Sequence, residues 1–130
     1  MPKRDAPRPT DAELEILNVL WQRGACTVRD VQQAISRAKP AVGYTTVLKL
    51  MQIMAEKGLV ERDESRRAHV YEARLAREQT QRQLIGDLLE RAFEGSATKL
   101  VMQALSAKQA SAEELTTIRE MLDEFERGES

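Results

Sequence analysis

The sequence predicts a mainly α-helical protein with one small β-hairpin, and three observations support this. Apolar residues recur at helical spacing through most of the 130 residues. One region, LVERDESRRAHVYEARL, instead holds two extended runs separated by a charged turn, which is typical of a hairpin. Aromatic residues make up only 4% of the chain, which argues against an all-β fold.

The composition excludes several classes of protein. Hydrophobic residues make up 42% and charged residues 32%, which indicates a globular chain. The apolar runs are too short to span a membrane, and the N-terminus lacks the apolar core of a signal peptide. The single cysteine excludes an internal disulfide. We therefore expect a cytoplasmic protein that is not inserted in a membrane.

The net charge of −1 is unevenly distributed along the chain. Residues 1–75 hold 13 Lys/Arg and 10 Asp/Glu, a net of +3, whereas residues 76–130 hold 7 and 11, a net of −4. A basic front half joined to an acidic rear half suggests that only the front half lies near phosphate.

The front of the chain predicts two short capped helices. Residues 1–9, with three prolines and four charges, predict a flexible arm. Thr10 and Glu13 form a capping box that opens a helix ending at Gly24. Thr27 and Asp30 resemble a second cap, and Pro40 prevents the second helix from continuing through residues 37–43. The expected inner faces are Leu14, Leu17, Leu20 and Trp21 in the first helix, and Val28, Val31 and Ile35 in the second.

Residues 43–57 predict a third helix with two distinct faces, which Gly58 ends. Its apolar face is formed by Val47, Leu50, Met51 and Met54, and its outer face by Thr45, Lys49, Gln52 and Glu56. Short polar groups and a lysine on an exposed helix suit the DNA major groove. The same pattern also describes an ordinary surface helix.

The hairpin follows directly after the third helix. Leu59 and Val60 start one extended run, Val70 and Tyr71 lie in the other, and the turn DESRRA joins them. Three short helices followed by a hairpin is the order of a winged helix-turn-helix. We therefore assign residues 10–75 to a DNA-binding domain of that fold, in which the hairpin is the wing.

Residues 76–130 predict three more helices, which we interpret as a dimerisation domain. Gly95-Ser96 separates the first two helices, and the capping box of Ser111 and Glu114 opens the last. So small a unit buries little of its own apolar surface, and a second copy is the economical partner. The alternative is that these helices pack on the front half. The expected interface residues are Leu84, Leu88, Leu89, Phe93, Leu100, Leu115, Ile118, Leu122 and Phe125.

The sequence offers no set of residues suited to catalysis. It has one histidine, one cysteine and no glycine-rich phosphate loop, and no spacing typical of a zinc site. We therefore expect no enzyme activity, cofactor or metal. Cys26 is interpreted as a small buried side chain, with a thiol sensor as the alternative. His69 lies in the wing or its second strand, where a DNA contact and an ordinary strand histidine are both possible.

Three segments of the chain resemble the penicillinase-repressor (BlaI/MecI) family over about residues 10–125. They are TDAELEILNVLWQRGACTVRDVQQAI, GYTTVLKLMQIMAEKGLVERDESRRAHVYEA and FEGSATKLVMQAL. The resemblance implies a homodimeric winged-helix repressor that binds a palindromic operator and controls resistance or stress genes. It also implies a membrane-bound sensor metalloprotease as a partner, acting directly or indirectly, whose signal leads to cleavage in the dimerisation region.

The sequence departs from the family pattern at three places. The family's cleaved Asn-Phe pair aligns with Gln103 and Ala104 here. The cysteine cluster of copper-sensing relatives is missing near the C-terminus, which argues against metal sensing. Tyr44 and Leu48 replace an acidic residue and an arginine in the third helix, so the operator sequence is not transferred.

The DNA contacts expected from this fold lie on the third helix and the wing. Tyr44, Thr45, Thr46 and Lys49 are the expected base contacts, and Gln52 is expected to reach a base or the backbone. Phosphate contacts are expected from Arg66 and Arg67 on the wing, from Arg29, and from Lys3 and Arg4 in the arm. The alternative function is a winged helix that binds protein and never DNA.

Overall fold

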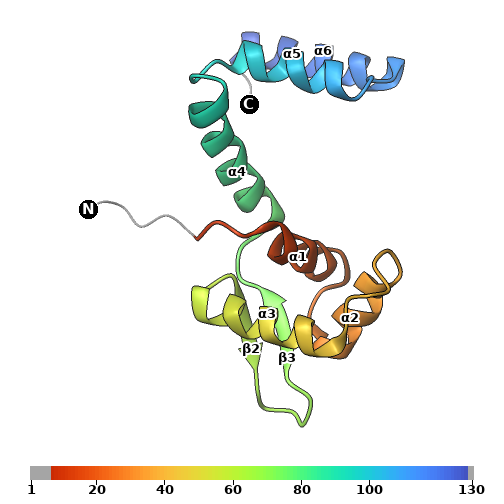
Figure 1. Cartoon of the computed structure of the whole chain (residues 1–130). Helices are drawn as coiled ribbons and strands as arrows, with labels where there is room; N and C mark the ends of the chain where they lie inside the picture. Colours follow the sequence, from red (N-terminus) through yellow and green to blue (C-terminus); the bar gives the residue numbers. More distant parts are fainter. Residues whose placement is uncertain (1–6, 129–130) are drawn as a thin grey trace, which may run out of the picture. The chain divides into compact units, whose positions relative to one another are not determined.

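The structure is a computed structural model that describes residues 7–128. It confirms the predicted fold class, which is mainly α-helical with a small antiparallel sheet (Figure 1). In chain order the elements are α1 (Asp11–Arg23), β1 (Cys26–Thr27), α2 (Val28–Ser36), α3 (Tyr44–Lys57), β2 (Val60–Asp63), β3 (Val70–Ala73), α4 (Arg77–Ala92), α5 (Ala97–Ala107) and α6 (Ala112–Glu126). Lys3 and Arg4 lie outside the described residues, and Pro9, the last residue of the predicted arm, is buried.

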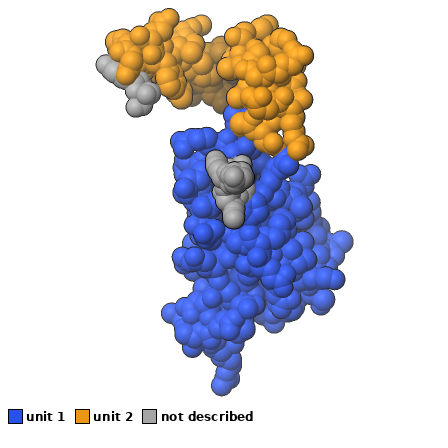
Figure 2. Space-filling model, turned by 90° about the vertical axis from the view of Figure 1, so that its left-hand side faces the viewer, with its two compact units in different colours: residues 1–85 blue, residues 86–130 orange. Residues whose placement is uncertain are grey.

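The chain divides into two compact units, Met1–Ile85 and Gly86–Ser130 (Figure 2). The division falls inside α4, later than the expected boundary between residues 75 and 76. Thr80, in the first turns of α4, is buried. The start of this helix therefore belongs to the first unit.

Side-chain caps define the starts of α1 and α2 as predicted. The Thr10 hydroxyl accepts from the Glu13 N–H at 3.2 Å, and the Glu13 carboxylate accepts from the Thr10 N–H at 2.9 Å. Thr27 and Asp30 make the same reciprocal pair at 3.1 Å each. Each cap satisfies main-chain donors that a helix start leaves without partners.

The sheet contains one strand more than the predicted hairpin. Its order is β1-β3-β2, and both pairings are antiparallel. The additional strand is β1, in which Cys26 lies opposite Tyr71. Two residues are too few to show any periodicity, and only pairing with the distant β3 makes them a strand. Its side chain is buried, as predicted.

The core of the first unit lies between α1, α2, α3 and the sheet. Val47, Met51 and Met54 of α3 are fully buried, which confirms the inner face predicted for that helix, although Leu50 is only half-buried. In α1, Ile16 is fully buried whereas the predicted Leu14 is half-buried. The complete buried apolar cluster is Ile16, Leu17, Leu20, Cys26, Val28, Val31, Val47, Met51, Met54, Leu59, Val60 and Tyr71.

The second unit is built from the end of α4 with α5 and α6. Ser96 caps α5, and Ser111 with Glu114 forms the predicted capping box of α6. No residue of α5 or α6 is buried in the single chain. Within the described residues, no helix combines the length and apolar character needed to cross a membrane.

Candidate nucleic-acid interface

The outer face of α3 presents every residue that the sequence analysis selected on this helix. Tyr44, Thr45, Thr46, Lys49 and Gln52 are all exposed. Val47, Met51 and Met54 on the opposite face of α3 are fully buried, so the helix packs on the core while this polar face remains exposed.

A groove of about 490 Å³ lies beside α3, between this helix and the wing. The described residues that line it include none with an acidic side chain. An open groove with basic and polar walls and no carboxylate suits a polyanion. Its lining residues are Thr27, Val28, Arg29, Tyr44, Leu48, Gln52, Arg62, Arg67, Ala68, His69 and Tyr71.

Arg62 is a basic residue of this groove that the sequence analysis did not select. It pairs with Tyr71 across β2 and β3, so the two side chains lie on the same face of the sheet. The hydrogen bond to Tyr71 and the nearby Glu64, whose Oε2 lies 2.6 Å from the Arg62 Nε, raise the pKa of the guanidinium. The sequence did contain a signal for Arg62. Side chains two residues apart in a strand lie on the same face, so Arg62 shares a face with the buried Val60.

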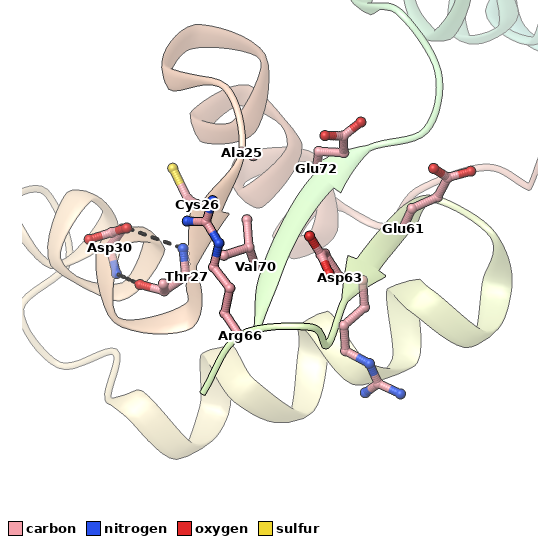
Figure 3. A pocket seen from close by; sticks show the side chains of 10 residues that line it. Ala25, Cys26, Thr27, Asp30, Glu61, Asp63, Arg66, Val70 and Glu72 are labelled. Atoms are coloured by element: carbon pink, nitrogen blue, oxygen red, sulfur yellow. Dashed lines mark hydrogen bonds between the residues drawn. The ribbon is translucent and has the colours of Figure 1, made fainter. Parts of the chain in front are cut away.

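The other face of the wing has the opposite character (Figure 3). A depression of about 530 Å³ there is lined by residues that include Asp30, Glu61, Asp63 and Glu72. Successive side chains of a strand point to opposite faces, so Glu61 and Asp63 lie on this side of β2, whereas Arg62 lines both this depression and the groove. We call this surface the acidic depression, because four carboxylates outnumber the guanidinium groups of Arg62 and Arg66 in its lining.

The two arginines at the wing tip, which were predicted as an equivalent pair, line different surfaces. Arg67 lines the groove beside α3. Arg66 lines the acidic depression, and its side chain extends toward Cys26 and Thr27 (Figure 3). The side chain and the main-chain N–H of Ser65 hydrogen bond to Asp63 and lower the pKa of its carboxyl. These bonds help to fix the turn in which the two arginines lie.

Arg29 lies in the first turn of α2 and contacts the start of α3. Its guanidinium carbon is 5.7 Å from the centre of the Tyr44 ring, within the range of a cation–π interaction. Both residues are exposed and line the groove. The structure thus brings a predicted phosphate contact next to a predicted base contact.

Neither residue considered for chemistry lies in a catalytic arrangement. Burial, and next the nearby Asp30, raise the pKa of the Cys26 thiol, which disfavours the reactive thiolate. His69 is exposed and lines the groove. The described residues contain no group of three or more His, Cys, Asp or Glu that could hold a metal ion.

Comparison with known proteins decides the family. The model of the penicillinase repressor family matches residues 9–124. The chain belongs to the penicillinase repressor family. Its members are transcriptional repressors and not enzymes.

Two relatives extend over nearly the whole chain. The transcriptional regulator BlaI of Mycobacterium tuberculosis is 33% identical over 119 residues, which cover 91% of this chain and 85% of the relative. The penicillinase repressor of Bacillus licheniformis is 25% identical over 121 residues, which cover 91% of each protein.

Two solved structures share the fold of the front of this repressor. The DNA-binding domain of the repressor BlaI has a TM-score of 0.51 at 21% identity, covering 59% of this chain and 93% of the other. The monomeric form of Bacillus licheniformis BlaI, in complex with the blaP half-operator, has a TM-score of 0.50 at 21% identity, covering 58% and 90%. These likenesses support the winged helix-turn-helix fold.

The residues that the sequence analysis assigned to dimerisation lie along α4, α5 and α6 or just after α4. Leu88, Leu122 and Phe125 are 45%, 58% and 63% exposed. The other predicted interface residues are half-buried, namely Leu84, Leu89, Phe93, Leu100, Leu115 and Ile118. Gln103 and Ala104, which align with the cleaved pair, are both exposed within α5.

Proposed function

We propose that this repressor binds a palindromic operator in double-stranded DNA as a homodimer. The observation that carries the proposal is the groove between α3 and the wing, whose described lining residues are basic, polar or apolar but never acidic. DNA phosphates supply much of the binding free energy, so a groove lined by basic and polar groups suits a duplex. The acidic depression would point away from the DNA.

In the proposed complex α3 enters the major groove with its first turn nearest the bases. Thr45, Thr46 and Lys49 are exposed there. Threonine methyl groups suit thymine, and lysine reaches guanine acceptors. Gln52 lies one turn after Leu48, where it would contact a base or the DNA backbone farther along the major groove.

The phosphate backbone would run along the groove beside the wing. Arg62 and Arg67 approach this path from the hairpin, and Arg29 from α2. Contacts of this kind fix the register of the protein on the duplex but carry no sequence information. We assign Arg66 a smaller role because it lines the acidic depression and, unlike Arg62, is not among the lining residues of the groove.

The second unit is proposed to join two copies of the chain. Apolar residues of α4–α6 are exposed in a single chain, including Leu122 and Phe125. Burying them against a second copy would remove apolar surface from water and place two winged helices on one two-fold axis. Two such domains require half-sites about 34 Å apart, one helical turn, or a multiple of it.

Regulation by a sensor is the further part of the proposal. We propose that the repressor acts in the cytoplasm on resistance or stress genes. A membrane-bound sensor metalloprotease would release it, directly or indirectly. Gln103 and Ala104 are exposed, but they lie within a helix, so cleavage between them would require α5 to open locally.

Binding of the full chain to duplexes from its own upstream region tests the DNA proposal. We expect selective binding to an inverted repeat. We also expect the affinity to fall on the order of 10³-fold or more between 50 and 200 mM salt if roughly six or more phosphates are contacted. A binding curve that does not change with salt would contradict the proposed phosphate contacts, and equal binding to unrelated duplexes would contradict operator recognition. Binding to none of the duplexes would favour the alternative of a protein-interaction module.

A further inference from the structure

The start of α3 carries an apolar surface in addition to its polar base contacts. Tyr44 and Leu48 are four residues apart and therefore lie on the same side of the helix. Both line the groove beside the wing. Tyr44 is 44% exposed, whereas Leu48 is half-buried against the core, so the leucine is the fixed part of this surface.

Arg29 restricts the orientation of the tyrosine ring. Its guanidinium carbon lies 5.7 Å from the ring centre, and a planar guanidinium stacks on an aromatic ring more specifically than an ammonium does. Arg29 also lies in the first helix of the helix-turn-helix, α2, which crosses the DNA backbone in this fold. A phosphate contact would hold the stacked pair in place.

An apolar surface in the major groove has one specific target among the four bases. Thymine presents a C5-methyl group there, whereas cytosine has only a hydrogen at C5 and the purines present the N7 acceptor. We propose that Tyr44 and Leu48 contact the C5-methyl group of one thymine in each half-site. Arg29 is the positioning residue for the tyrosine ring. This inference rests on the proposed function and adds one determinant of operator sequence.

A thymine-to-uracil substitution is the direct test, because it removes only the methyl group. The probe is a duplex that the full chain selects from a pool of random sequences. Each thymine is replaced in turn by uracil, and the Kd is measured by fluorescence anisotropy at constant salt. We expect one thymine in each half-site whose replacement weakens binding about fourfold, which corresponds to ~0.8 kcal/mol for one buried methyl group.

Variants of the apolar surface connect this effect to named residues. We compare the Kd of the uracil duplex with the Kd of the thymine duplex at that position and call their quotient the Kd ratio. Tyr44→Ala and Leu48→Ala should each reduce this Kd ratio toward one. Tyr44→Phe keeps the ring and should keep the ratio. Arg29→Lys keeps the charge but loses the planar stack, so the ratio should fall while the salt dependence of binding stays. Thermal melting of each variant verifies that it is folded.

The outcomes separate this inference from the proposed function. Tight, selective binding with equal affinity for thymine and uracil at every position would overturn the inference alone. If both alanine variants kept the wild-type ratio of uracil Kd to thymine Kd, the inference would also be overturned. The methyl contact would then be assigned to Thr45 or Thr46. If the full chain bound no duplex, the proposed function would fail together with this inference.

Discussion

The indole Nε1 of Trp21 donates a hydrogen bond to the main-chain oxygen of Leu75 at 2.9 Å, across 54 positions of the sequence. The Arg77 guanidinium carbon lies 5.8 Å from the centre of the same indole ring. The sequence predicts Trp21 on the inner face of the first helix. It is half-buried, and it joins the end of α1 to the segment that leads into α4.

Replacement of Trp21 by Phe should weaken this connection. Phe keeps most of the apolar area but has no donor for the Leu75 oxygen. We expect a loss of about 1 kcal/mol in the free energy of unfolding, as is typical of one hydrogen bond. Urea unfolding of the full chain measures this loss. Amide exchange should also quicken at the start of α4, and unchanged exchange there would contradict the assigned connection.

The carboxylate of Glu13 should make stability depend on acid pH. Glu13 is 2% exposed, and its carboxylate oxygens accept from the Lys57 Nζ at 2.8 and 3.0 Å. Burial raises the pKa of this carboxyl. The hydrogen bonds from Lys57 and Thr10, together with the charge of Lys57, outweigh burial, so the pKa is lowered overall. The stabilisation is therefore complete above the unfolded value of ~4.3 and is lost as pH falls through the folded pKa.

The matching variant is Glu13→Gln, which keeps a side-chain acceptor for the cap but removes the charge. We expect it to lose about 1.5–3 kcal/mol at pH 7, the range of hydrogen bonds to charged groups. The difference from wild type should shrink below the folded pKa, where the wild-type carboxyl is protonated. A difference that stays constant from pH 7 to pH 3 would show that the charge has no such role.

Gly58 and Gly86 should respond in opposite directions to replacement by alanine. Gly58 ends α3 in the left-handed conformation, with φ at 85°. A Cβ there would meet only the Arg74 Nη1 at an ordinary 3.6 Å, so the cost is the backbone conformation, about 1–2 kcal/mol. Gly86 lies within α4, and a Cβ would meet nothing within 4 Å. Gly86→Ala should stabilise the helix by roughly 0.5–1 kcal/mol. Thermal unfolding of both variants tests the contrast.

Arg67 and Arg66 should contribute unequally to DNA binding. Arg67 lines the groove beside α3, whereas Arg66 lines the acidic depression on the other face of the wing. Arg67→Ala should weaken binding to all duplexes alike and reduce the slope of log affinity against log salt by about one. Arg66→Ala is the matched control and should change the slope less. Equal slopes for the two variants would contradict the separation of the two faces.

Leu122→Asp should separate the proposed dimer into monomers. The side chain of Leu122 is 58% exposed in the single chain, so the substitution leaves the fold of one copy intact but places a charge in the proposed interface. Sedimentation should show a monomer, and affinity for a two-half-site operator should fall roughly 10²–10⁴-fold. Glu120→Gln, at another exposed position of α6, should remain dimeric. A dimeric Leu122→Asp protein would exclude this face from the interface.

The helices and their ends were determined almost entirely by local sequence. A capping box requires only two residues three positions apart, as Ser111 and Glu114 show, and a left-handed stop requires only one glycine, as Gly58 shows. The buried face of α3 followed from a single period of 3.6 residues. These features depend on contacts within one or two helical turns, so they can be predicted from neighbouring residues.

The tertiary structure decided the features that depend on distant residues. Strand β1 exists because Cys26 pairs with Tyr71, and neither residue has a local property that predicts this pairing. The different surfaces of Arg66 and Arg67 depend on the geometry of a turn that carries no Asn-Gly or Asp-Gly signal. The stacking of Arg29 on Tyr44 likewise joins two helices. Local propensities therefore determined which segments are helices, whereas long-range packing determined which side chains meet.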